Sequence, residues 1–138
     1  MKLFGIDYGR RRIGVAVTDE NGEYIRGLPT IDRQKIPDYF HALRSLIAHE
    51  CPERLVIGLP LDIDGDETVM SKEIRAFASE LGKWVSLPVI FVDESLSSIQ
   101  ASALMRFRKK KDRRDKEAID RMAACIILES FQKGLTCD

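Results

Sequence analysis

The spacing of apolar residues changes several times along the chain, and each change marks a predicted element. Short runs rich in β-branched residues predict strands, whereas apolar residues three and four positions apart predict amphipathic helices. The predicted strands span residues 2–8, 12–18, 23–31, 54–58 and 88–92. The predicted helices span residues 36–50, 68–84, 95–107 and 117–131.

The order of these elements predicts an α/β fold. Tight turns at Gly9-Arg10 and Asn21-Gly22 separate the first three strands, which should form an antiparallel meander. Each later strand follows a helix, and right-handed crossovers should make strands 54–58 and 88–92 parallel to the first. A mixed five-stranded sheet of three antiparallel strands plus two parallel crossover strands, flanked by helices, is the ribonuclease-H-like layout.

Length and composition indicate one globular domain over residues 1–138. Hydrophobic residues make up 44% of the chain and charged residues 32%, which is an ordinary globular balance. We expect a cytoplasmic protein with no membrane partner, because no apolar run reaches membrane-spanning length and the first acid comes too early for a signal peptide. Three dispersed cysteines and two histidines make a structural zinc site improbable.

The formal net charge is zero, but the charges are unevenly distributed. Residues 106–116 hold eight basic and two acidic residues, a local net charge of +6 that the rest of the chain balances. Such runs are usually solvated, mobile loops, but beside a catalytic site this one would bind phosphates. The candidates for phosphate contact are Arg108, Lys109, Lys110, Lys111, Arg113 and Arg114.

Three acids stand where chemistry is expected. Asp7 ends the first strand, and it is either a metal-binding carboxylate or an acid that caps the following turn. Asp93 and Glu94 close the last strand, and alternation lets only one of them face a given site, with Glu94 the favoured ligand. Asp120 lies on the margin of the apolar face of the last helix, where it could instead favour the helix dipole.

The combination of these acids is more specific than any one of them. Parallel strands ending at Asp7 and Glu94 share the edge where open sheets carry their sites, and the last helix adds Asp120. Hard oxygen ligands without histidine or cysteine suit Mg²⁺ or Mn²⁺. Two such ions can activate water and stabilise the leaving oxygen of a phosphodiester.

A second motif follows the strand at residues 54–58. Gly58 would let a nucleic-acid backbone approach closely. The loop behind it carries Asp62, Asp64 and Asp66, but its spacing does not match a calcium-binding loop. A solvated turn is the favoured interpretation of these three acids.

Four segments together resemble the YqgF family, the Holliday-junction-resolvase-like nucleases of bacteria. The segments read GIDYGRRRIGVAV, GLPLDIDG, DESLSS and IDRMAACIILES, and the resemblance as a whole covers nearly the whole chain. The resemblance implies a ribonuclease-H-like fold with Asp7, Glu94 and Asp120 as catalytic, magnesium-binding residues. The family usually has Arg after the third-motif Glu, whereas this chain has Ser95, so Arg10, Arg11 or the basic stretch would have to supply the phosphate contact.

The resemblance also implies a function and leaves rivals open. The leading hypothesis is a magnesium-dependent endonuclease that processes the 5′ end of precursor 16S ribosomal RNA. One alternative is a Holliday junction resolvase on branched DNA, which should be a twofold dimer. Another is a non-catalytic nucleic-acid-binding assembly factor. The Asp-x-Gly turn at Asp7 also occurs in actin-like and sugar-kinase ATPases, but those proteins need two such subdomains to enclose ATP. An ATP-binding module is therefore disfavoured, because a chain of 138 residues supplies only one. The partner is therefore structured RNA or branched DNA, bound by a monomer or weak homodimer.

Overall fold

The computed structural model describes residues 1–94, 116–134 and 136–137. The predicted helix at 95–107 and the basic stretch lie outside these residues, apart from the backbone of Lys116. One sheet has the strand order β3-β2-β1-β5-β6, and β4 pairs separately with β2. Its strands are β1 (Leu3–Asp7), β2 (Arg12–Thr18), β3 (Ile25–Gly27), β4 (Ile31–Asp32), β5 (Arg54–Leu59) and β6 (Val89–Asp93).

The predicted topology is confirmed, with one correction. β1 pairs antiparallel with β2 and parallel with β5, and β5 pairs parallel with β6. The single strand predicted at 23–31 is instead two short strands, which pair with opposite ends of β2. Pro29 lies between them, and a proline has no N–H for the strand ladder, so the sheet contains six strands and not five.

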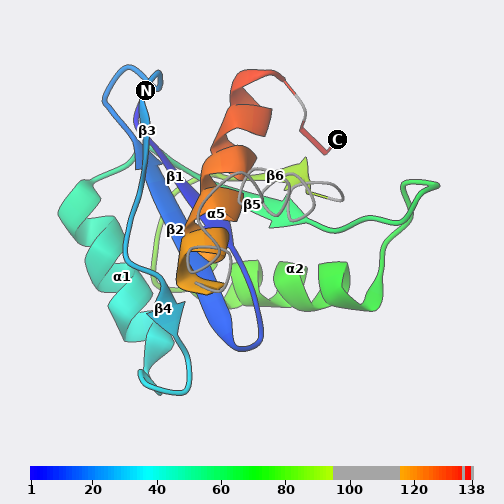
Figure 1. The fold of residues 1–138 in the computed structure, drawn as a ribbon, viewed down its shortest axis with the longest axis horizontal. Helices are drawn as coiled ribbons and strands as arrows, with labels where there is room; N and C mark the ends of the chain where they lie inside the picture. The colour runs from blue at the N-terminus through cyan, green and yellow to red at the C-terminus, as the bar shows by residue number, and fades with distance from the viewer. Residues whose placement is uncertain (95–115, 135, 138) are drawn as a thin grey trace.

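Helices cover both faces of the sheet, as predicted (Figure 1). On one face, α1 (Tyr39–Glu50) and α2 (Val69–Gly82) contribute Leu43, Ile74 and Leu81 to the larger core. On the other face, α5 (Lys116–Gln132) lies against β1 and β2, in orange in Figure 1. None of the helices in the described part of the chain is long and apolar enough to span a membrane.

Small residues let α5 approach the sheet closely. Ala123 and Ala124 of the helix are buried, as the sequence predicts. On the sheet, a Cβ added at Gly14 would overlap the backbone carbonyl oxygen of Asp120. The backbone of α5 therefore rests directly on β2 at the level of Asp120, next to Asp7, which is the register partner of Gly14.

Candidate active site

Asp7 stands at the carboxyl end of β1, on the face that α5 covers. Leu3, at the other end of β1, belongs to the core cluster beneath α5, and strand alternation puts Asp7 on the same face. The parallel strands β5 and β6 end at the same edge of the sheet. The structure thus places Asp7 where the sequence analysis expected a site.

Glu94 follows β6 and turns toward Asp7. Its backbone N–H donates to the Leu59 carbonyl at 3.0 Å, which continues the pairing of β5 with β6. The interaction of its carboxyl group with Asp7 lowers the pKa of Asp7. Asp93 is exposed. The structure therefore brings Glu94 to Asp7, and not Asp93.

Gly58 makes room for the Glu94 side chain. A Cβ added at Gly58 would lie 2.5 Å from Oε2 of Glu94 and 2.8 Å from Cδ1 of Ile127. Gly58 itself is buried. The space above Gly58 is therefore occupied by a carboxylate of the candidate site, and a nucleic-acid contact at Gly58 stays a prediction.

Asp120 reaches the same region from the first turns of α5. Its carboxylate accepts a hydrogen bond from Nε of Arg12 at 2.8 Å, and both side chains are about three-quarters buried. The negative charge of Asp120 raises the pKa of Asp7. The three carboxylates nevertheless do not close into one tight group, because the only acidic trio of the described residues within 4.8 Å is found elsewhere.

The pKa of Asp7 reflects its burial and its acidic neighbours. Its pKa is raised from 3.8 to about 6, mainly because burial disfavours the charged carboxylate and also because Asp120 repels it. The hydrogen bond from Glu94 acts in the opposite direction. A divalent cation would offset the repulsion among these carboxylates, so the all-oxygen donor set of Asp7, Glu94 and Asp120 fits a hard metal ion.

The raised pKa of Asp7 predicts a pH-dependent stability of the metal-free protein. A carboxyl whose pKa rises on folding destabilises the protein when ionised, so the penalty is absent below about pH 4 and complete above about pH 6. Asp7→Asn should therefore stabilise the protein at pH 7.5 by up to about 3 kcal/mol and change little at pH 4. Urea unfolding with a chelator at both pH values measures this, and an equal effect at both would contradict the burial of the Asp7 charge.

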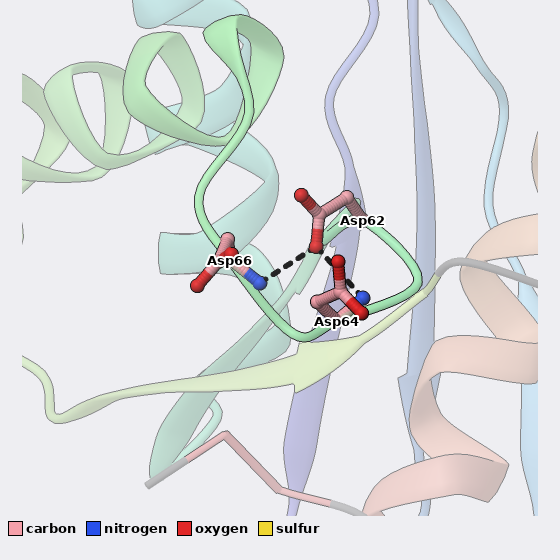
Figure 2. Close-up of side chains that lie close together, drawn as sticks. All are labelled: Asp62, Asp64 and Asp66. Carbon is pink, nitrogen blue, oxygen red and sulfur yellow. Dashed lines mark hydrogen bonds between the residues drawn. The ribbon is translucent and has the colours of Figure 1, made fainter.

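The tight acidic trio is Asp62, Asp64 and Asp66, in the exposed loop after β5. Figure 2 shows that the Asp62 carboxylate accepts hydrogen bonds from the backbone N–H groups of Asp64 and Asp66, at 2.9 and 2.8 Å. The cluster is compatible with divalent-cation binding. Its hydrogen bonds are those of a solvated turn, which the sequence analysis favoured for this loop.

The predicted nucleic-acid contacts divide into two groups. Arg10 and Arg11 are substantially exposed at the turn after β1, but both are ion-paired, Arg10 with Glu73 of α2 and Arg11 with Asp32 of β4. The remaining candidates, Arg108, Lys109, Lys110, Lys111, Arg113 and Arg114, lie outside the described residues.

Sequence reasoning missed the pair of Arg12 and Asp120, whose members are 108 positions apart. One signal was available: Arg12 and Gly14 alternate onto the same face of β2, and Gly14 suits a closely packed helix. It also missed Glu73, which accepts hydrogen bonds from both Arg10 and the hydroxyl of Tyr8. The spacing of residues on α2 does not indicate that Glu73 contacts Tyr8 and Arg10, which follow β1.

Comparison with known proteins identifies the family. The model of the RuvX family, described as Holliday junction resolvase, matches residues 1–133. The chain belongs to this family. Two curated relatives, from Crocosphaera subtropica and Nitratidesulfovibrio vulgaris, bear the name "Putative pre-16S rRNA nuclease" and are 39% and 40% identical to it. Each match covers 95% of this chain and 92% of the relative.

Solved structures confirm the ribonuclease-H-like fold. RuvC of Thermus thermophilus in complex with a Holliday junction substrate has a TM-score of 0.60 at 15% identity, covering 99% of this chain and 98% of its own. The Fowlpox virus resolvase bound to Holliday junction DNA has a TM-score of 0.59 at 11% identity, covering 98% and 99% respectively. The predicted family and the predicted enzyme class, a nuclease acting on phosphodiester bonds, are confirmed by these RuvX relatives.

Proposed function

We propose that this RuvX protein is a metal-dependent endonuclease whose reaction takes place at Asp7, Glu94 and Asp120. The observation that carries the proposal is the convergence of three acids at one edge of the sheet: Asp7 ends β1, Glu94 lies over Gly58 of β5, and Asp120 rests on Gly14, the register partner of Asp7. Two acids in contact at the carboxyl end of parallel strands are costly in a protein without a ligand. A bound divalent cation would offset the repulsion between these acids.

Mg²⁺ or Mn²⁺, held by oxygens of these three residues, would supply Lewis-acid activation of water and of the scissile phosphate. Asp7 stands on the rigid end of β1, so it fixes the position of the ligand set relative to the sheet. The Glu94 carboxylate lies over Gly58, in the space that a side chain at position 58 would fill. Asp120 completes the set from α5, with Arg12 holding one of its oxygens.

The proposed substrate is the 5′ end of precursor 16S ribosomal RNA, cut in the cytoplasm. The names of the relatives that align over nearly the whole chain support this choice. Branched DNA is the second candidate, favoured by the family description and by the structural neighbours bound to Holliday junctions. A monomer or weak homodimer suits the RNA substrate, whereas a junction resolvase should be a twofold dimer.

Matched substrates separate these functions. The parent protein and Asp7→Asn are incubated with precursor 16S RNA and with four-way DNA junctions, each with magnesium or with a chelator. The proposal predicts magnesium-dependent RNA cleavage by the parent alone. Cleavage only of junctions would favour the resolvase, and RNA binding without cleavage by the parent would identify a non-catalytic assembly factor.

The basic stretch is proposed to supply phosphate contacts. Changing Lys109, Lys110 and Lys111 together to Ala should weaken RNA binding. Each phosphate contact that is lost reduces the number of counterions that binding releases. The slope of log affinity against log salt should become shallower by about one unit per lost contact. Binding is measured with Asp7→Asn as the background, so that the RNA stays intact. Unchanged affinity and slope would leave the stretch as a solvated loop.

A further inference from the structure

Arg12 is a cation that lies against the proposed metal site, in the part of the chain that the structure describes. It is the first residue of β2 and lies two positions from Gly14, on whose Cα the Asp120 backbone rests. Its Nε donates to Oδ2 of Asp120 at 2.8 Å. The Arg12 side chain is 22% exposed, against 63% for Arg10 and 49% for Arg11, so Arg12 is the best shielded of these three arginines from water.

The Arg12–Asp120 ion pair offsets part of the negative charge that gathers around Asp120. Asp7, Glu94 and Asp120 bring three acidic groups to one region, with Glu94 over Gly58 and Asp120 over Gly14, the register partner of Asp7. Asp120 instead has its carboxylate on Arg12, and the trio does not close to 4.8 Å. The guanidinium therefore compensates one carboxylate and fixes the direction in which its Oδ2 points.

We propose that Arg12 is a positioning residue for Asp120: it supplies a counter-charge to the carboxylate cluster in the metal-free protein, and a bound divalent cation takes over that part of its role. This inference rests on the proposed metal site. It assigns to Arg12 an effect on stability that depends on metal. An ordinary structural ion pair would have the same effect with and without metal.

Glutamine separates the charge of Arg12 from its hydrogen bond. The Nε2 amide of glutamine is as many bonds from the backbone as Nε of arginine, so Arg12→Gln can still donate to Oδ2 of Asp120 but carries no charge. Arg12→Lys keeps the charge and moves the donor. The control is Arg75→Gln, because Nε of Arg75 donates to Glu67 at the same 2.8 Å, in a more exposed ion pair. Arg75 is on α2, which packs on the opposite face of the sheet from α5.

The test is the melting temperature of the full-length protein with a chelator and with saturating Mn²⁺. With the chelator, Arg12→Gln should melt about 3 °C or more below the parent, and Arg12→Lys should stay close to the parent. With Mn²⁺, Arg12→Gln should regain most of that loss. Arg75→Gln should differ from the parent by the same amount in both conditions. In an Asp7→Asn background, the metal-free loss from Arg12→Gln should shrink, because there is less negative charge to compensate.

The outcomes distinguish the two proposals. If Mn²⁺ raises the melting temperature of the parent but the loss from Arg12→Gln is equal with and without Mn²⁺, the role of Arg12 is overturned and the metal site stands. No loss from Arg12→Gln in either condition also overturns it. If Mn²⁺ leaves the melting temperature of the parent unchanged, the metal site itself is contradicted. The proposal that a divalent cation replaces the counter-charge of Arg12 is then overturned as well.

Discussion

Asp7→Asn should lower the rate of magnesium-dependent cleavage by at least about 1,000-fold, equivalent to about 4 kcal/mol of transition-state stabilisation. Asparagine has the shape of aspartate but lacks the charge that holds a divalent ion. The fold should remain intact, since the replacement relieves the repulsion that raises the pKa of Asp7. Single-turnover cleavage of the preferred substrate measures the effect.

The matched comparison for this prediction is at the end of β6. Glu94→Gln should be as inactive as Asp7→Asn, whereas Asp93→Asn should cleave within a few-fold of the parent rate, because Asp93 is exposed and Glu94 contacts Asp7. A variant at Asp7 that cuts at the parent rate would remove it from the set of essential ligands. Loss of activity in Asp93→Asn alone would reverse the assignment of the two neighbouring acids.

Gly14→Ala should destabilise the protein by about 3 kcal/mol, a large effect for one methyl group. The added Cβ would overlap the carbonyl oxygen of Asp120, and a backbone atom cannot turn aside as a flexible side chain can. Helix α5 must therefore shift away from β2, which also moves Asp120 away from Asp7. Chemical unfolding measures the loss of stability, and cleavage should fall as well.

Gly82→Ala is the control for Gly14→Ala. Gly82 ends α2, has nothing within 4 Å of an added Cβ, and has no positive φ. There alanine should stabilise the protein by about 0.5 kcal/mol, because it restricts the unfolded chain. If both replacements have the same small effect, the close packing of α5 on β2 is wrong.

The fold was largely predictable because periodicity reports burial directly. Phe4, Ile6 and Tyr8 alternate onto the larger core, while Leu3 and Asp7 face α5. The division of the third strand was not predicted, because β-branched residues on both sides of Pro29 continue the strand pattern while the missing N–H interrupts the ladder.

The site was predictable only in part, because its details depend on contacts between distant segments. Alternation alone left Asp93 and Glu94 as alternatives, and the packing of Glu94 over Gly58 distinguishes them. The pairing of Arg12 with Asp120 needs the three-dimensional position of α5 on β2. The local sequence around Arg12 or Asp120 does not indicate this contact, apart from the small residues that let α5 approach β2.

Metal binding tests the central claim most directly, because the described residues contain two candidate acidic clusters. Mn²⁺ is titrated into the parent, into Asp7→Asn, and into a variant in which Asp62, Asp64 and Asp66 are all Asn. The site at the sheet edge predicts that the loop variant binds Mn²⁺ as the parent does, and that Asp7→Asn binds at least about tenfold more weakly. Parent-like binding by Asp7→Asn, with binding lost in the loop variant, would place the metal in the loop and contradict the account.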